Sequence, residues 1–318
     1  DEVFDLVMRH HGSMSGEHGD GIARSKYNRQ LFGEDIYRGF LDLKNLWDPQ
    51  NILNPGKVVN APDLDRDLRW GADYKTVEIR THLDFSREGG FARAIEMCNG
   101  AGVCRKRDIG TMCPSYHATM DEEHSTRGRA NLLRAALSGA LPHEEFSSPR
   151  MYEALDLCLE CKGCKRECPS KVDLAKIKYE FLAHYYEKNG TPLRARFFAN
   201  AERLNRVGSA FAPLSNWMLK LAPVRKLNEA LLGVDARREL PPFASQTFSA
   251  WFRKRTVEPR SRPAGQVALF ADCFTEWNYP ETGRAAVEVL EAAGFEVVLA
   301  DKGCCGRPSI SKGFLEDA

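Results

Sequence analysis

Apolar residues recur at helical spacing through much of the chain. Ile36, Phe40, Leu43 and Trp47 predict a helix from about Gly33 to Trp47, and Asp48-Pro49 ends that pattern. Two later helices are also expected from this combination of apolar spacing and end signals.

The two later helices carry recognisable start signals. Ser148-Pro149 places a capping residue before a proline at the first turn, and this helix should stop where a cysteine-rich loop begins. Asp173 is the expected cap of the next helix, which should run to about Lys188 and end at Asn189-Gly190. The apolar positions on one face of that helix are Leu174, Ile177, Phe181 and Leu182.

The pattern changes after residue 235. Residues 191–235 still look helical, whereas residues 236–264 are rich in Pro, Arg and Ser and predict a linker, with prolines at Pro241, Pro242, Pro259 and Pro263. Beyond it, Gln266–Ala271 and Phe295–Ala300 are short apolar runs on either side of a helical segment, Glu281–Ala293. A strand, a helix and a strand in that order indicate parallel strands in an α/β domain. Another short strand is expected around Val77–Leu83.

These patterns divide the chain into five stretches: 1–60, a connector 61–90, a helical region 91–235, the linker 236–264, and an α/β region 265–318. The chain does not begin with Met and opens inside an apolar-periodic run, so we expect it to be a fragment of a longer protein. No apolar run reaches the ~18–20 residues that span a bilayer. The 45 Lys and Arg balance 44 Asp and Glu, which gives no reason to expect nucleic acid as a partner.

The ten cysteines are unevenly placed. None precedes Cys98, seven lie between Cys98 and Cys168, and three follow at Cys273, Cys304 and Cys305. A secreted disulfide scaffold would be short and would spread its cysteines along the chain. The clustering instead favours metal or cofactor binding in a reducing compartment.

Cys158, Cys161, Cys164 and Cys168-Pro169 have the spacing C-x2-C-x2-C-x3-C-P. This is the bacterial ferredoxin run, in which three cysteines bind one [4Fe–4S] cluster and the fourth serves another cluster. Cys113-Pro114 stands where an earlier run would close. The crossed arrangement therefore predicts one [4Fe–4S] cluster bound by Cys113, Cys158, Cys161 and Cys164. A structural zinc site is the alternative.

The earlier run is incomplete. Cys98 and Cys104 occupy its first and third positions, but the second position is Ala101, which cannot bind iron. With Cys168 they would make a second site that lacks one ligand. Three outcomes stay open: a three-iron cluster, a four-iron cluster with a non-cysteine ligand, or no second cluster. Asp108 lies near the missing position, as a ligand or as an ordinary loop carboxylate.

Basic residues surround both runs, and they have two interpretations. Cations near an anionic cluster would raise its reduction potential, whereas residues of this kind also form solvated surfaces. Ser125 or Thr126 is the expected cap of a helix in this region. The basic residues are Arg105, Lys106, Arg107, Arg127, Arg129, Arg134, Lys162, Lys165 and Arg166.

The first sixty residues contain a loop rich in glycine, Gly12–Gly21, which includes Glu17 and His18. Glycines let the backbone approach a ligand closely, and a Glu-His pair can supply a metal ligand and a base. A surface loop would tolerate the same residues.

Together with Asp48-Pro49 and the run Ile52–Lys57, this loop resembles the end of the C-terminal domain of flavin-dependent 2-hydroxy acid dehydrogenases. This vanillyl-alcohol-oxidase-type family includes enzymes of the D-lactate, glycolate and D-2-hydroxyglutarate type. The resemblance implies that Glu17 binds a divalent metal such as zinc and that His18 lies at the substrate hydroxyl, as a catalytic base or as an anchor. It also implies that Asn54 and Lys57 lie near the flavin, FAD, or close the substrate site.

The ferredoxin-type region and the tail resemble the iron–sulfur subunit of glycolate oxidase, which has modules with a Cys-Cys-Gly signature. Cys273 with Cys304-Cys305-Gly306 resembles half of such a module. These three cysteines are cluster ligands or, alternatively, the adjacent Cys304 and Cys305 are a buried pair or a redox-active vicinal disulfide. The implied fold is multidomain α+β: the end of a flavoenzyme C-terminal domain, an α-helical ferredoxin-like [4Fe–4S] domain, and a partial α/β Cys-Cys-Gly domain.

The resemblance implies an oxidoreductase in which a D-2-hydroxy acid reduces FAD and electrons leave through [4Fe–4S] to a quinone, a cytochrome or an electron-transfer flavoprotein. The expected partners are thus the FAD-binding portion, the substrate and that acceptor, in the cytoplasm or peripherally at the inner membrane. This fragment alone is expected to be inactive. The alternatives are a non-catalytic iron–sulfur electron-transfer module and a zinc-stabilised interaction protein. The sequence names neither the hydroxy acid nor the acceptor.

Overall fold

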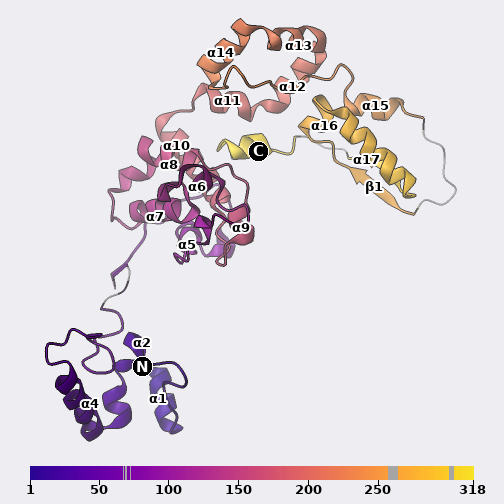
Figure 1. The fold of residues 1–318 in the computed structure, drawn as a ribbon. Coiled ribbons are helices and arrows are strands. Elements are labelled where there is room, and N and C mark those ends of the chain that lie inside the picture. Colours follow the sequence, from indigo (N-terminus) through magenta and orange to yellow (C-terminus); the bar gives the residue numbers. More distant parts are fainter. Residues whose placement is uncertain (67, 69, 72, 257–263, 301–303) are drawn as a thin grey trace. The chain divides into compact units, whose positions relative to one another are not determined.

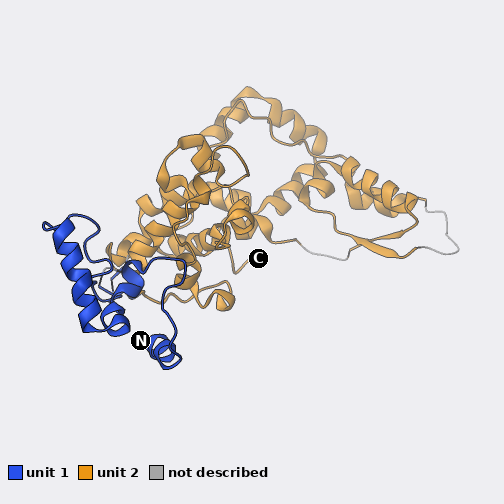
Figure 2. Ribbon diagram, turned by 60° about the horizontal axis from the view of Figure 1, so that its bottom comes forward, with its two compact units in different colours: residues 1–75 blue, residues 76–318 orange. Residues whose placement is uncertain are grey.

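The structure is a computed structural model that describes residues 1–66, 68, 70, 71, 73–256, 264–300 and 304–318. It contains two compact units, Asp1–Lys75 and Thr76–Ala318 (Figure 2). Parts of the connector and linker predicted from the sequence, at residues 67, 69, 72 and 257–263, lie outside the described residues, as do residues 301–303.

The first unit is built from four helices: α1 (Glu2–Arg9), α2 (Gly21–Ser25), α3 (Asn28–Phe32) and α4 (Glu34–Trp47). Helix α4 confirms the helix predicted from the spacing of its apolar residues. Its C-cap is Asp48, whose carboxylate accepts hydrogen bonds from the backbone N–H groups of Ile52 and Leu53. The small interior includes Phe4 stacked on Tyr27, with ring centroids 4.5 Å apart.

The second unit begins with a helical part that holds the seven clustered cysteines (Figure 1). Short helices alternate with loops before two longer helices, α7 and α10. Its elements are η1 (Ser86–Glu88), α5 (Phe91–Glu96), η2 (Val103–Arg105), α6 (Pro114–Thr119), η3 (Glu122–His124), α7 (Thr126–Leu137), η4 (His143–Ser147), α8 (Pro149–Asp156), α9 (Gly163–Glu167) and α10 (Leu174–Asn189).

Local caps explain where these helices begin, as the sequence predicts. The side chains of Ser125, Ser148 and Asp173 each accept a hydrogen bond from a backbone N–H in the first turn of α7, α8 and α10. Helix α10 ends at Gly190, which has a positive φ of 79°. The four apolar residues predicted to share one face of α10 are all buried. The caps and the buried face of α10 are therefore confirmed.

Four helices follow in the region predicted to be helical: α11 (Leu193–Ala199), α12 (Ala201–Ala210), α13 (Ala212–Lys220) and α14 (Ala222–Leu232). Beyond them, helix α15 (Phe248–Lys254) lies inside the segment expected to be a linker. Thr247 caps α15, and Phe248 is fully buried. The segment thus contributes to a core as well as connecting two regions.

The strand–helix–strand pattern is confirmed by β1 (Gln266–Leu269), α17 (Pro280–Ala292) and β2 (Glu296–Leu299). The two strands pair in parallel, with Val267 opposite Val297. A short helix, α16 (Cys273–Trp277), precedes α17. Phe248 packs here with Ala271, Val287 and Val297, so α15 belongs to the same core as the sheet (Figure 1).

The last helix, α18 (Arg307–Ser311), leads to a tail that packs on the helical part. Gly313 follows it with φ +75°, and a Cβ atom at this position would lie 2.7 Å from the Cβ of Leu182 and 2.9 Å from the backbone N of Ala183. The ring of Phe314 lies 6.4 Å from that of Tyr186. Glycine is therefore needed where the tail crosses α10.

The strand predicted around Val77–Leu83 is wrong. Among the described residues of this segment no strand forms, because no neighbouring strand pairs with it. Its backbone N–H groups bond elsewhere: Val77 to the carbonyl of Leu137, and His82 and Leu83 to the carboxylate of Glu180. The fold as a whole is predominantly helical, with one small parallel sheet in the described residues.

Candidate metal centre

Four cysteines line one cavity in the helical part of the second unit. They are Cys113, Cys158, Cys161 and Cys164, and the cavity is small and open to solvent. Cys113 and Cys164 are buried, Cys158 is half-buried and Cys161 is exposed. The structure thus brings together the four residues that the crossed ferredoxin spacing predicts as ligands of one cluster.

A carboxylate ties the loop before Cys113 to helix α9, which carries Cys164. Glu167 accepts hydrogen bonds from the backbone N–H groups of Thr111 at 2.8 Å and Met112 at 3.0 Å. These bonds hold the pKa of Glu167 below its ordinary value. Gly110 has φ +85°, and a Cβ there would lie only 2.4 Å from the carboxylate. Sequence reasoning missed Glu167, although it lies inside the cysteine motif.

A buried lysine holds the loop that carries Cys158. The Nζ of Lys178 donates to the carbonyl oxygens of Cys158 at 2.8 Å and Asp156 at 3.2 Å, and it pairs with Glu160 at 3.2 Å. Lys178 was also missed. The signal was its place on α10 four residues after Leu174, on the apolar face of the helix.

Arg129 of α7 is fully buried beside the cavity. Its Nε donates to the carbonyl of Ala154 at 2.7 Å, and its Nη1 donates to the carbonyl of His124 at 2.7 Å and to the hydroxyl of Ser115 at 3.0 Å. Nη1 also lies 3.8 Å from the sulfur of Cys113. Its Nη2 has no hydrogen-bond partner among the described residues, and neither does the hydroxyl of Thr126, which lines the cavity.

Burial dominates the ionisation of the thiols. It raises the pKa of Cys164 to about 11, and it also raises the pKa of Cys158, against the opposing effect of Lys178 and Arg129. Metal and cluster ligation requires thiolates. Without a cluster, burial therefore favours neutral thiols at Cys158 and Cys164. Lys178 is already paired with Glu160, so the charge that an anionic cluster would compensate is that of Arg129.

The other three clustered cysteines are buried, but among the described residues they do not line this cavity. Burial raises the pKa of the Cys104 thiol, and the nearby Cys98 adds to this effect. Arg134 donates to the carbonyl of Cys98 at 3.0 Å. Ala101 and Asp108 are both exposed.

The basic residues near the motifs differ in burial, and Arg127 is half-buried. Arg129 and Arg134 are buried, so the interpretation as a solvated surface does not apply to them. Arg105, Lys106, Arg107, Lys162, Lys165 and Arg166 are exposed, as a solvated surface requires.

The candidate residues of the first unit lie at its surface. Glu17 and His18 are neighbours, with the His18 Nε2 3.0 Å from the Glu17 carboxylate, and both side chains are mostly exposed. Lys57 donates to the side-chain oxygen of Asn54 at 3.3 Å.

The three late cysteines lie in the second unit. Cys273 begins α16 and is half-buried. Cys304 and Cys305 are exposed.

Three family models match the chain in succession. Residues 1–58 match "FAD linked oxidases, C-terminal domain", residues 94–172 match "4Fe-4S dicluster domain", and residues 267–318 match "Cysteine-rich domain". The chain thus carries the end of an FAD-linked oxidase domain, a 4Fe-4S domain and a cysteine-rich domain, in that order. These matches confirm the resemblance seen in the sequence and support iron–sulfur clusters and FAD as the cofactors.

Relatives of these dehydrogenase domains agree. D-2-hydroxyglutarate dehydrogenase of Escherichia coli strain K12 is 28% identical over 357 residues, which cover 99% of this chain and 35% of the relative. One of the subunits of anaerobic glycerol-3-phosphate dehydrogenase from the same strain is 36% identical over 167 residues, 52% of this chain and 42% of the relative. The glycolate oxidase iron–sulfur subunit of that strain is 28% identical over 229 residues, 68% and 49% respectively.

The chain spans about a third of the length of the D-2-hydroxyglutarate dehydrogenases that it matches. No solved structure matches it. Among the described residues, every helix is too short or too polar to cross a membrane.

Proposed function

We propose that the full-length protein oxidises a D-2-hydroxy acid at FAD and passes the electrons through a [4Fe–4S] cluster held by Cys113, Cys158, Cys161 and Cys164. A relative that matches along 99% of the chain is named D-2-hydroxyglutarate dehydrogenase, which supports this substrate class. The acceptor would be a quinone, a cytochrome or an electron-transfer flavoprotein.

The observation that carries the proposal is the fully buried Arg129 next to the four-cysteine cavity. A buried charge is strongly unfavourable unless it is compensated. Arg129 bonds only neutral oxygens and a sulfur among the described residues, and one of its nitrogens has no partner. An anionic thiolate-bound cluster in the cavity would provide the missing negative charge.

The spacing of the sulfurs supports a cluster over a single zinc ion. Zn–S bonds of about 2.3 Å in a tetrahedral site place the sulfurs about 3.8 Å apart. Among the described residues, no three cysteine sulfurs come within 4.8 Å of one another. A cubane distributes its four ligands over four irons and so accepts the wider spacing.

Each protein group near the cavity then has a defined part. A [4Fe–4S] cluster supplies one-electron transfer. Glu167 holds the loop before Cys113 and Lys178 holds the loop of Cys158, through backbone N–H and carbonyl groups. Arg129 would place a positive charge beside a bound cluster and would therefore raise its reduction potential.

A second cluster at Cys98, Cys104 and Cys168 belongs to the same proposal. The description of the matching family model as a dicluster domain favours it, as does the burial of all three cysteines. The exposed Ala101 leaves one position for a non-cysteine ligand or for a three-iron cluster.

The remaining candidate residues keep the parts that the family resemblance implies. Glu17 would bind a divalent metal such as zinc, and His18 would contact the substrate hydroxyl. Asn54 and Lys57 would lie near FAD. Their exposure in the first unit is compatible with a site completed by the FAD-binding portion. Cys273, Cys304 and Cys305 would ligate a cluster in a complete cysteine-rich module.

Iron and acid-labile sulfide per chain, measured after anaerobic purification of the full-length protein, test the cluster sites. About four of each would mean one cluster, about seven or eight would mean two, and about eleven or twelve would mean that the cysteine-rich module holds a further cluster. Cys161→Ala should remove about one cluster's iron, whereas Glu153→Ala, exposed on α8, should remove none. Near-zero iron with one equivalent of zinc would overturn the redox proposal.

A flavin measurement separates the dehydrogenase from an electron-transfer module. The full-length protein should co-purify with FAD and reduce an artificial acceptor when given D-2-hydroxy acids. A protein with iron but no flavin would leave a ferredoxin-like module and refute the dehydrogenase.

A further inference from the structure

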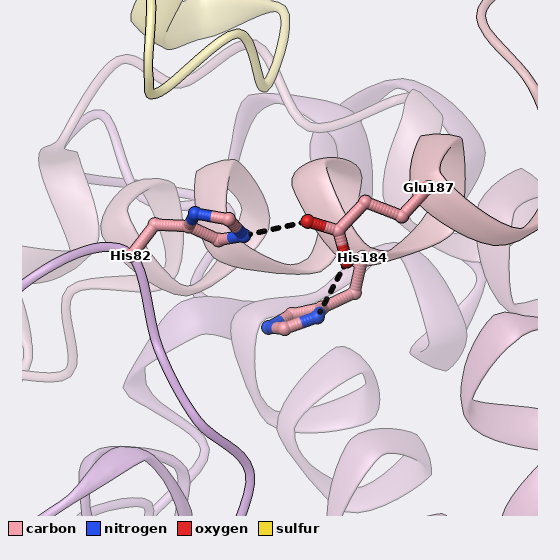
Figure 3. A group of neighbouring side chains, drawn as sticks. All are labelled: His82, His184 and Glu187. Atoms are coloured by element: carbon pink, nitrogen blue, oxygen red, sulfur yellow. Dashed lines mark hydrogen bonds and ion pairs between the residues drawn. The ribbon is translucent and has the colours of Figure 1, made fainter.

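Two histidines and a glutamate form a cluster outside the cysteine cavity (Figure 3). His82 comes from the segment before η1, and His184 and Glu187 lie on α10. The Nε2 of His82 is 2.9 Å from one oxygen of Glu187, and the Nδ1 of His184 is 3.4 Å from the other. The three potential ligand atoms all lie within 4.8 Å of one another.

The fully buried carboxylate of Glu180 holds this arrangement in place. Glu180 accepts hydrogen bonds from the backbone N–H groups of His82 at 2.8 Å and Leu83 at 2.9 Å, and its Oε1 is 3.1 Å from the Nε2 of His184. The Nε2 of His184 makes this contact with Glu180, so the Nδ1 of the same ring faces Glu187. Figure 3 shows Glu187 between the two rings.

A carboxylate also lies near His82. Glu316 in the C-terminal tail lies 4.0 Å from the Nδ1 of His82, the nitrogen that faces away from Glu187. Metal-bound histidines usually direct their other ring nitrogen to a carboxylate or carbonyl, which fixes the tautomer and makes the ligand more basic. The ring of His184 shows that arrangement through Glu180, whereas Glu316 lies at ion-pair distance from His82 without a hydrogen bond.

We propose that His82, His184 and Glu187 bind a divalent transition-metal ion, with zinc as the best fit, and that water completes the coordination. Two imidazoles and a carboxylate form one of the three-ligand sets that zinc adopts. With bonds of about 2.0–2.1 Å, tetrahedral ligand atoms lie about 3.3 Å apart. The observed contacts of 2.9 and 3.4 Å go to different oxygens of Glu187, and the three ligand atoms, which lie within 4.8 Å of one another, would move closer together around an ion.

The charge and the access of the site also suit a cation. Three carboxylates, those of Glu180, Glu187 and Glu316, face two histidines that are neutral when they act as ligands. The Glu187 side chain is 57% exposed, so an ion can enter from solvent. Bound metal would fasten the segment around His82 to α10. The inference does not depend on the proposed function, because it uses none of the cysteines.

Zinc binding to the full-length protein with its clusters intact tests the site. After removal of loosely bound metal, zinc should bind with one equivalent that is lost, or weakened by more than roughly tenfold, in Glu187→Gln and in His184→Gln. Glu187 is at the surface, so its variant should fold. Lys188→Gln, exposed in the same turn of α10, should bind zinc like the wild type. Iron content and circular dichroism verify that each variant is folded and loaded.

X-ray absorption at the zinc edge identifies the ligands of the equivalent that the variants lose. Nitrogen and oxygen at about 2.0–2.1 Å are expected, and sulfur at about 2.3 Å would place zinc on cysteines and overturn the proposal. Equal zinc binding by the wild type, Glu187→Gln and His184→Gln would overturn it as well. The cluster would then be a set of ion pairs that joins residues 76–85 to α10.

Discussion

Replacing Arg129 by methionine tests the central electrostatic argument. Methionine has a similar length and an apolar side chain, so it fills much of the buried space and removes the charge. The guanidinium nitrogen lies 3.8 Å from the sulfur of Cys113, one of the four cysteines of the cavity. Reduction would add a negative charge to a bound cluster. In the variant, Arg129 no longer attracts that charge, so the reduced state is less favourable.

The expected shift follows from Coulomb's law. The added electron spreads over the cluster, so its mean separation from the guanidinium exceeds the contact to the sulfur and is about 6 to 7 Å. At that separation and an effective dielectric constant of about 20, two unit charges interact by about 2.5 kcal/mol. For a one-electron couple this equals a decrease of on the order of 100 mV in the reduction potential.

An anaerobic redox titration followed by electron paramagnetic resonance measures the potential of the reduced cluster. Arg129→Lys retains a charge and should move the potential far less than Arg129→Met. Arg150→Met removes an exposed arginine of α8 and controls for net charge, since exposed charges are screened by solvent. An unchanged or higher potential in Arg129→Met, with full iron content, would refute the assignment of Arg129 as the counter-charge.

Three further predictions concern the frame around the site. Asp173→Ala should destabilise α10 by about 1 kcal/mol through loss of its cap, whereas Asp173→Asn keeps the cap. Burial alone would raise the pKa of Asp173, but Lys165 and the N–H of Lys176 hold it below its ordinary value. The carboxylate thus stabilises the protein above about pH 4, and less as the pH falls through its folded-state pKa. Asp173→Asn should therefore lose less melting temperature in acid than the wild type. An acid profile equal to that of the wild type would refute this. Gly313→Ala adds a Cβ against α10 and should speed hydrogen exchange in residues 304–318; unchanged exchange would mean that the tail is not held there. Phe248→Ala should lower the stability of the small α/β core by about 3–5 kcal/mol. Protease should then cleave between residues 264 and 300 while the cluster signal persists. Cleavage with an equal loss of the cluster signal would show that the two cores unfold together.

The helices that the sequence predicts are those with local end signals. Helix α10 has its Asp173 cap, its apolar stripe and its terminal glycine within the segment itself, so its limits could be read from neighbouring residues. Helix α15 was missed because the prolines around it suggested a linker. Its signal was present, since Thr247 caps it and Phe248, Trp251 and Phe252 recur at helical spacing.

Contacts between distant segments explain what the sequence could not predict. The segment Val77–Leu83 has the composition of a strand, but its N–H groups bond to Glu180, about a hundred residues later. The ferredoxin spacing predicts that Cys158, Cys161 and Cys164 share the cavity because these ligands are close in sequence, whereas the distant Cys113 follows from the crossed pattern of two-cluster ferredoxins. The burial of Arg129 and Lys178 follows from packing between helices, and the basic composition around the cysteines does not distinguish them from exposed neighbours.

The buried guanidinium of Arg129 affects the expected abundance of the protein in a cell that is short of iron. A newly made chain without its cluster would fold around an uncompensated cation, so its folded state would be less stable and more often open. Cellular proteases remove chains that spend more time unfolded. Iron starvation should therefore lower the amount of this protein, rather than accumulate an intact but inactive form, and restored iron supply should raise its abundance without new transcription.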